Sequence, residues 1–316
     1  MPTPLLDNRQ LGPDVARANL LTNGGLEIWQ RGNGPFNVNG VWAADRWRIA
    51  STTNGTVSAS KDTSNADSSR GSQTCAAITC TVTADANAQF YHQFQLASPS
   101  SGGDFPAANL PLSLSIRVRT ATANAVRAGL YNGSAWTYTA FHTGDGTYQT
   151  LTVSVTMLAT GGQMGQVTVS FALPCTAYID NAMLVVGSQA ADYVPLHPAD
   201  DLARCLRYYQ RLGANAGGGI FGLGQSGGAS AYIFVPLPAR MAVAPTVTIS
   251  ATADFSCWDA GTSTRTMTSG PSLYSINPVA LDRLMLAGNA PNLVAGNATW
   301  LVGNNANAFI GVEANP

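Results

Sequence analysis

Apolar residues recur at every second position over much of this chain, in short runs separated by Gly, Asn, Ser or Asp. In one run Leu112, Leu114, Ile116 and Val118 alternate with serine and arginine, and residues 151–157 and 167–173 repeat the pattern. Because successive side chains of a strand point to opposite faces, this period predicts strands with one buried and one wet face. Regular short strands without intervening helices predict an all-β protein built from sandwich or jelly-roll domains.

One segment has a helical period instead. It begins at Pro198, has acidic residues in its first turn, and reaches a stop signal at Gly213. Its apolar stripe consists of Leu202, Cys205, Leu206 and Tyr209. We expect a linker helix over 198–213, whose stripe packs either on the flanking domains or on the same helix of a neighbouring subunit.

The predicted fold class is therefore all-β, with two β-sandwich (jelly-roll-like) domains joined by one short α-helix. The first domain is expected over 18–197 and the second over 214–316. Residues 1–17 have no periodicity, and two interpretations remain open: an extended arm or a frayed terminus. The glycine-rich stretch 213–230 lacks the lysine of a phosphate-binding loop and is expected to be a surface loop.

The surface is expected to be poor in charge. Charged residues make up 10% of the chain, the formal net charge is −1, and Lys61 is the only lysine. Nucleic-acid binding depends on neutralising phosphates, so this balance argues against it. The 5 cysteines have no metal-type spacing and are expected to be small buried hydrophobes.

The amino terminus has no basic stretch followed by an apolar run, and no segment reaches the roughly 18 apolar residues of a membrane helix. We therefore expect a soluble product, made in a cytoplasm without a signal peptide and not inserted in a membrane. A virion component released by lysis would combine this origin with a low-charge surface.

Residues with catalytic chemistry are sparse. The sequence has 3 histidines, and none of them is in a two-histidine metal spacing. Asp200 and Asp201 are adjacent on a helix, so they point in different directions and do not form an acid–base pair. The prediction is that this chain is not an enzyme.

A structural calcium is the one cofactor that the residues indicate. Glu27 opens the first domain and Asp180 lies in its last long strand, so carboxylates from both ends of the domain are available with backbone carbonyls as oxygen ligands. The alternative is that Glu27 caps a turn and Asp180 accepts backbone hydrogen bonds.

The candidate carbohydrate-binding residues combine aromatic rings with planar polar groups. Sugar rings stack their C–H faces on aromatic rings, and Arg and Gln bind the hydroxyl groups. The candidates are Tyr131, Trp136 and Tyr138 around a turn, with Tyr91, Gln93, Arg117 and Arg119 on the polar faces of neighbouring strands. They would cluster if the strands share a sheet. The alternative is that Trp136 and Tyr138 pack the sandwich edge.

Three segments of the first domain resemble jelly-roll carbohydrate-binding modules of polysaccharidases and phage appendages. They are NLLTNGGLEIWQRG with ADRW, GDGTYQTLTVSV and TAYIDNAMLVVG. The three tryptophans between Asn19 and Trp47, namely Trp29, Trp42 and Trp47, are expected to anchor one side of the core. In that family acidic residues at the positions of Glu27 and Asp180 often hold calcium, although Leu26 replaces the usual Phe here.

The segments DLARCLRYYQRL and VPLPARMAVAPTVTI resemble the carboxy-terminal part of tailed-phage fibre or virion proteins, although the ending Ala-Asn-Pro departs from that pattern. The resemblance implies a virion protein, a tail fibre or head-surface fibre, that binds host-surface glycan without catalysis. It also implies a homo-oligomer, most often a trimer, with the helix stripe as subunit contact and residues 1–17 attaching to other virion proteins.

Two other functions remain open at this stage. One is a purely structural decoration or baseplate-hub protein that makes protein contacts only. The other is a polysaccharide depolymerase, which would need a pair of carboxylates in one cleft.

Overall fold

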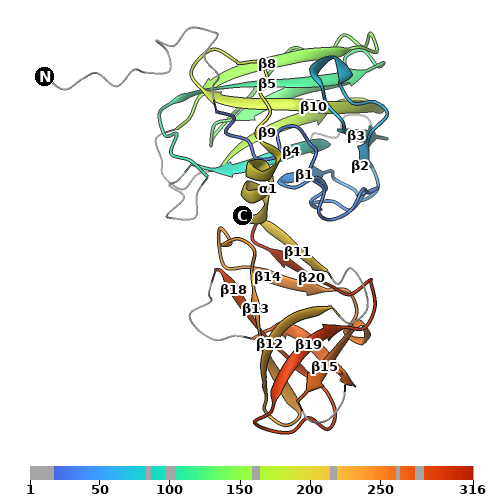
Figure 1. Cartoon of the computed structure of the whole chain (residues 1–316). Helices are drawn as coiled ribbons and strands as arrows, with labels where there is room; N and C mark the ends of the chain where they lie inside the picture. Colours follow the sequence, from blue (N-terminus) through green and yellow to red (C-terminus); the bar gives the residue numbers. More distant parts are fainter. Residues whose placement is uncertain are drawn as a thin grey trace, which may run out of the picture. The chain divides into compact units, whose positions relative to one another are not determined.

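The computed structural model describes residues 18–82, 87–96, 104–158, 164–213, 219–260, 264–274 and 281–315 (Figure 1). Within these ranges the chain is almost entirely β, with a single α-helix, which confirms the predicted fold class. Among the described residues, no helix is long and apolar enough to cross a membrane. The chain divides into two compact units, Met1–Leu202 and Ala203–Pro316.

The first unit is a jelly-roll-like sandwich of two five-stranded antiparallel sheets. We name each sheet after one of its interior strands. In spatial order the β4 sheet consists of β1 (Trp47–Ala50), β4 (Gln89–Gln95), β9 (Met164–Phe171), β6 (Val126–Tyr131) and β7 (Trp136–Tyr138). The β5 sheet consists of β2 (Val57–Asp62), β3 (Cys75–Cys80), β10 (Cys175–Val186), β5 (Pro111–Thr120) and β8 (Tyr148–Thr156). A short 3-10 helix, η1 (Ser68–Arg70), precedes β3.

The core of this unit lies between the two sheets and follows the alternation seen in the sequence. The β5 sheet contributes Leu112, Leu114, Ile116 and Val118 from β5, all fully buried. The β4 sheet contributes alternate residues of β4, such as Phe90 and Phe94. All five cysteines of the chain are buried and free, as predicted.

Trp47 ties the opening segment to this core. Its ring stacks on Phe90 with centroids 5.1 Å apart and meets the edge of His92 at 5.4 Å. Its indole Nε1 donates to the Asn23 carbonyl at 3.0 Å. The neighbouring Arg46 is also buried, and its guanidinium donates to the Gln93 carbonyl of β4. A fully buried tryptophan with a satisfied N–H is an effective anchor, so the prediction is confirmed for Trp47. Trp29 is also part of the core, but the prediction is wrong for Trp42, which pairs with Arg48 outside it.

The second unit is a smaller sandwich of a three-stranded and a seven-stranded sheet. The three-stranded sheet consists of β11 (Tyr209–Gly213), β20 (Phe309–Glu313) and β14 (Thr246–Ile249). The seven-stranded sheet consists of β16 (Thr264–Thr266), β15 (Phe255–Asp259), β19 (Ala298–Gly303), β12 (Ile220–Ser226), β13 (Ser230–Pro236), β18 (Arg283–Asn289) and β17 (Ser269–Leu273). A 3-10 helix, η3 (Thr252–Asp254), leads into β15. Between the sheets lies a second apolar core that includes Ile233, Phe255, Leu301 and Ile310.

The helix is shorter than the sequence predicted. Helix α1 (Pro198–Leu206) begins at the expected residue with Asp200 and Asp201 in its first turn, but it ends at Leu206. The expected last turn is instead strand β11, in which Tyr209 pairs with Glu313 of β20. Pairing with a distant strand overrides the local helical period, so the prediction of a helix over 198–213 is wrong for its second half.

The predicted glycine-rich loop is also partly wrong, because residues 220–226 form β12. The glycines are required by the close approach of the neighbouring strand. A Cβ on Gly224 would lie 1.7 Å from the Tyr232 carbonyl oxygen, and one on Gly222 would lie 2.2 Å from that of Phe234. Glycine therefore marks tight backbone contact in a strand here. The predicted arm at 1–17 lies outside the described residues.

His92 predicts how the stability of the first unit depends on pH. Burial lowers the pKa of this imidazole well below its usual value, and the nearby Arg46 adds to the effect. The unfolded chain binds a proton near pH 6.5 that the folded chain excludes, so the free energy of unfolding falls as the pH drops below about 6.5. We expect the His92→Gln variant to lose this fall in the free energy of unfolding at low pH. Chemical denaturation between pH 7.5 and 5.5 measures it, and parallel pH profiles for the two proteins would contradict the assignment.

Candidate functional site

The outer face of the β4 sheet carries polar and aromatic side chains on successive strands. In β4 the inward residues are Phe90, His92 and Phe94, so Tyr91 and Gln93 point outward. In an antiparallel sheet, residues that are directly opposite lie on the same face. One cross-strand row therefore runs Trp42, Arg48, Tyr91, Thr168, Gly129, Tyr138. The next row runs Gln93, Gln166, Tyr131, Trp136.

We call this surface the aromatic–amide face and define it by those two rows. Strands lie about 4.8 Å apart, so the first row extends over roughly 24 Å. Tyr131, Trp136, Tyr138 and Gln93 are each half-buried, whereas Tyr91 and Thr168 are buried and form its floor.

One end of the aromatic–amide face is an aromatic cluster. The ring centroids of Tyr131 and Trp136 lie 5.2 Å apart, and Trp136 stacks on Tyr138 at 5.6 Å. Tyr138 lies over Gly129, where an added Cβ would come within 2.6 Å of the ring. The Arg127 guanidinium sits 3.9 Å from the Tyr138 centroid. Glycine below and arginine beside the ring thus fix its orientation.

Hydrogen-bonding side chains occupy the centre. The Gln89 Oε1 accepts from Gln166 Nε2 at 3.3 Å and from the Thr168 hydroxyl at 3.2 Å. These contacts orient the amides of two adjacent strands. An amide offers both a donor and an acceptor, which suits the hydroxyl groups of a bound ligand.

The other end combines a cation with an indole. Arg48 donates from Nε to the Gly40 carbonyl, and its guanidinium lies 5.4 Å from the Trp42 ring centroid. Burial raises the pKa of the neighbouring Tyr91, although Arg48 opposes this shift. Tyr91 therefore stays a neutral phenol beside a cation at ordinary pH.

The structure brings together five of the seven predicted carbohydrate-binding residues: Tyr91, Gln93, Tyr131, Trp136 and Tyr138. The prediction that Arg117 and Arg119 join them in one sheet is wrong, because both lie on β5 in the opposite sheet.

The two arginines have structural partners in the β5 sheet. Arg117 Nε donates to Asp67 Oδ2 at 2.7 Å, and an Arg119 N–H donates to Asn65 Oδ1 at 2.6 Å. Arg119 also lies 4.6 Å from the ring centroid of Tyr178. Alternation along a strand shows which side chains share a face of that strand but does not say which strand lies next to it.

The sequence analysis did not identify Arg48, Gln166 and Thr168 as residues of the two rows, and it expected Trp42 in the core. It also did not identify Gln89 and Arg127, which contact residues of the rows. The signal that would have found Gln166 and Thr168 is the alternation QVTVS over 166–170, where the apolar positions face the core. The outward positions of that segment, Gln166, Thr168 and Ser170, are polar but not charged.

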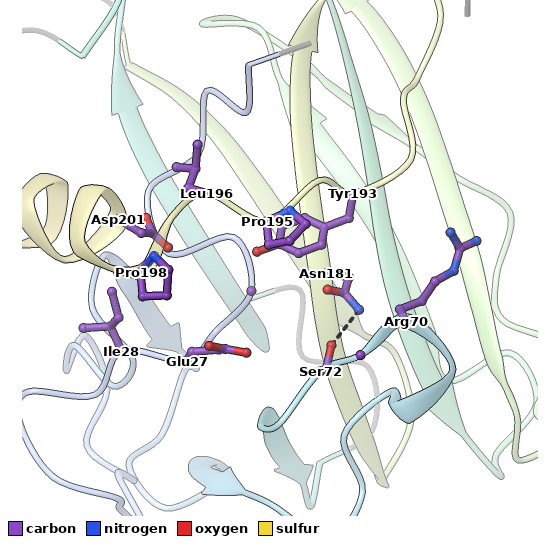
Figure 2. Close-up of a pocket in the computed structure, with 12 residues that line it drawn as sticks. Glu27, Ile28, Arg70, Ser72, Asn181, Tyr193, Pro195, Leu196, Pro198 and Asp201 are labelled. Carbon is purple, nitrogen blue, oxygen red and sulfur yellow. Dashed lines mark hydrogen bonds between the residues drawn. The ribbon is translucent and has the colours of Figure 1, made fainter. Parts of the chain in front are cut away.

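A pocket of about 310 Å³ lies elsewhere in the first unit (Figure 2). Its polar lining includes Glu27, Asn181, Tyr193 and Asp201, and Figure 2 shows Asn181 bonded to Ser72. Asn181 has a left-handed backbone, φ +48°, at a bulge of β10. Bulges re-aim side chains, and this one turns Asn181 toward the pocket.

Tyr193 and Asp201 both line this pocket. Burial raises the pKa of Tyr193, and the carboxylates of Asp201 and Glu27 add to the effect. The Asp201 Oδ1 accepts the Asn23 N–H at 2.8 Å, which fixes the first turn of α1. The pocket thus has an acidic side and a phenol that remains protonated.

The calcium candidates differ in environment. Asp180 is fully buried and accepts the N–H groups of Asp67 at 2.9 Å and of Asn181 at 2.7 Å, while burial raises its pKa to about 7. Glu27 is exposed. Within the described ranges no group of three or more His, Cys, Asp or Glu side chains could hold a metal ion. Asp180 therefore accepts backbone hydrogen bonds, as in the alternative to calcium binding. If a calcium ion binds here, most of its ligands would be backbone carbonyl oxygens.

The predicted subunit contact on the helix stripe is wrong for two of its residues. Cys205 is fully buried and Tyr209 is nearly so, and Tyr209 lies in a strand. Leu202 is exposed and Leu206 half-buried. Only these two leave surface for a partner.

The three histidines have no catalytic arrangement in the described residues. His142 is buried in a turn, where its Nδ1 accepts the Gly144 N–H at 2.9 Å and its Nε2 contacts the Thr147 carbonyl at 3.1 Å. His92 is part of the core, and His197 is exposed next to α1.

The sequence matches no protein-family model and no curated protein. Solved structures with a similar fold include the CBM22-1 xylan-binding domain of Paenibacillus barcinonensis Xyn10C, with TM-score 0.36, 13% identity, and coverage of 55% of this chain and 98% of that one. The tandem CBM22-1–CBM22-2 domain of the same protein has TM-score 0.36, 10% identity, and coverage of 95% and 96%.

A further similar structure is the enzymatically active domain of tailspike protein 4 of Bacteriophage CBA120, with TM-score 0.37 and 10% identity. The match covers 54% of this chain but only 21% of that one. At these values the likenesses carry no inference about what this chain binds.

Calcium binding stays a prediction from the sequence, and thermal unfolding tests it. A ligand that binds only the folded state raises the melting temperature. If calcium binds at Glu27, adding millimolar calcium after treatment with a chelator raises the melting temperature of the wild type, and the Glu27→Gln variant loses that rise. If added calcium leaves the melting temperature of the wild type unchanged, the prediction that this domain binds calcium is wrong.

Proposed function

We propose that the aromatic–amide face binds a glycan chain without chemically changing it. The observation that carries the proposal is the continuity of the two rows, in which an aromatic cluster at one edge passes into amides and then into an Arg–Trp pair. Sugar rings have apolar C–H faces and hydroxylated edges, so they need flat aromatic surfaces beside hydrogen-bonding groups. The aromatic–amide face has both, in rows long enough for several rings.

The charges of the face support a neutral or acidic glycan. Its strands carry Arg48 and Arg127, and the described outward positions of those strands include no Asp or Glu. A carboxylated sugar would find cations near both ends of the rows.

The same distribution supports binding rather than hydrolysis. Most glycosidases use a pair of carboxyl groups that flank the scissile bond. No such pair stands on the described outward positions of these strands. The aromatic–amide face therefore lacks the groups that such chemistry requires.

The arrangement is also preorganised for binding. Tyr138 is held between the Gly129 backbone and the Arg127 guanidinium, and Gln166 is held by Gln89. Side chains that are ordered before binding lose less conformational entropy when a ligand arrives, which favours affinity.

We further propose that the chain is a component of a phage virion, a tail fibre or head-surface fibre, and that it acts as a homo-oligomer, with a trimer as the first expectation. The support is the resemblance of residues 201–212 and 235–249 to the carboxy-terminal part of such proteins, together with a low-charge surface. Glycan binding would then attach the particle to its host. A decoration or baseplate-hub protein is the second candidate.

Glycan binding is tested by comparing two variants of the face with one control. Trp136→Ala removes an aromatic surface, and Gly129→Val pushes the Tyr138 ring from its position. We expect each to weaken binding to a glycan found on an array about tenfold or more, which corresponds to about 1.4 kcal/mol.

The control for this test is Tyr178→Ala on the opposite sheet, where an arginine also lies over a tyrosine. Its affinity should equal that of the wild type. If Tyr178→Ala weakens binding and Trp136→Ala does not, the glycan site lies on the β5 sheet and the proposal fails.

The virion role is tested with host cells. Fluorescently labelled protein should bind the host surface, compete with adsorption of the phage, and lose both activities on Trp136→Ala. A protein that is found in purified particles but does not bind cells at any concentration would instead be a decoration or baseplate-hub component.

A further inference from the structure

A second cross-strand row lies on the outer face of the seven-stranded sheet, and it is apolar. Consecutive strand pairs align Trp258 with Trp300, Trp300 with Leu223, Leu223 with Phe234, and Phe234 with Met285. These residues come from β15, β19, β12, β13 and β18, so the row crosses five of the seven strands. We name it the apolar row.

The apolar row is open to solvent in the isolated chain. The exposed fractions are 48% for Trp258, 56% for Leu223 and 52% for Phe234. The two tryptophan rings are in contact, with centroids 5.3 Å apart. Ile220, next to the row on β12, is 58% exposed.

The opposite face of the same strands is buried, so exposure is not a consequence of a loosely packed domain. Cys257, Leu301, Ile233 and Leu286 alternate with the residues of the row and lie in the core. The row is the face of a well-packed sheet that no described element of the second unit covers.

Its chemistry differs from that of the aromatic–amide face. Leu223, Ile220 and Met285 offer aliphatic surface, which gains most when another apolar surface excludes water from it. The ring–amide alternation that suits sugars is missing from this row. The next row of the same face pairs Gln225 with Tyr232, but the five residues of the apolar row offer no hydrogen-bonding group other than two indole N–H groups. The occupant that fits the apolar row is therefore a protein surface.

The charges favour a second copy of the same chain as that protein. Among the described strand positions of this outer face, Arg283 is the only one that is charged, and Asp282 pairs with it at 3.3 Å. Two copies that meet through this face would therefore bring no like charges together. A partner chosen by opposite charge would find almost nothing to recognise.

The size of the patch also fits. An aromatic side chain has roughly 150–250 Å² of surface, so two that are half-exposed leave on the order of 200 Å². With Leu223, Ile220 and the partly exposed Trp300 and Met285, the patch reaches about 400–500 Å², within the range of about 300–600 Å² for the largest apolar patch of a monomer, which is often functional. A standard interface buries about 800 Å² per partner, and the polar rim of the sheet would supply the rest.

We propose that the apolar row is the contact between copies of this chain in a homo-oligomer. It replaces the helix stripe, of which only Leu202 and Leu206 are accessible. The inference rests on the proposed homo-oligomer, but it does not depend on glycan binding, because it concerns the other domain and a different chemistry.

The test uses single charge substitutions in the full-length protein, with its mass measured by analytical ultracentrifugation. The wild type should sediment as two or more chains. Leu223→Glu and Phe234→Glu should each place a carboxylate in the contact and yield monomers, with the equilibrium constant for association falling at least a hundredfold. Because both side chains are exposed, the circular dichroism spectrum should not change.

Two further variants serve as controls. Val38→Glu substitutes an equally exposed residue of the first unit, and Leu202→Glu substitutes the exposed residue of the helix stripe. Both should keep the wild-type mass. A wild type that is monomeric at all concentrations overturns the proposal, as does an oligomer that Leu202→Glu dissociates but Leu223→Glu and Phe234→Glu do not.

Discussion

The pleat of the antiparallel sheet is the constraint on which both surfaces depend. Side chains alternate between the two faces of each strand, and residues that are opposite across a ladder point the same way. When the inward positions of neighbouring strands are filled with core residues, the outward positions necessarily line up in rows. Gln93 with Gln166 and Leu223 with Phe234 are therefore neighbours because the residues beside them are buried.

The outward rows of the two sandwiches differ in chemistry. The outward rows of the β4 sheet mix rings with amides and hydroxyls, and the ring of Tyr138 is oriented by Gly129 and Arg127. The outward row of the seven-stranded sheet joins Trp258 to Phe234 through apolar neighbours. A hydroxylated ligand loses hydrogen bonds to water when it binds, so the protein surface must supply hydrogen bonds in their place. An apolar surface loses none, so its binding site needs no such groups. The composition of each row thus distinguishes the kind of ligand it suits.

Local sequence pattern was sufficient to predict the all-β class, the outward direction of Tyr91 and Gln93, and the burial of Trp47. Each of these depends on parity within one strand or on the size of one side chain. The errors arose where the outcome depends on a distant strand. Arg117 and Arg119 have the expected parity, but β5 pairs with β10 and β8 and so lies in the other sheet. Likewise, the residues from Tyr209 continue a helical period, and only pairing with β20 makes them a strand.

A chain with so few charges controls its associations differently from most soluble proteins. Soluble domains usually have charge on about a quarter of their residues, and repulsion keeps their copies apart. Here 10% of residues are charged, so long-range repulsion is weak and short-range chemistry decides what each face meets. Surfaces that display only hydroxyl and amide groups stay hydrated and offer little to another protein surface, so the apolar row is where we propose contact between copies. In such a protein we expect the position of a few exposed rings and aliphatic side chains, rather than net charge, to determine where copies associate.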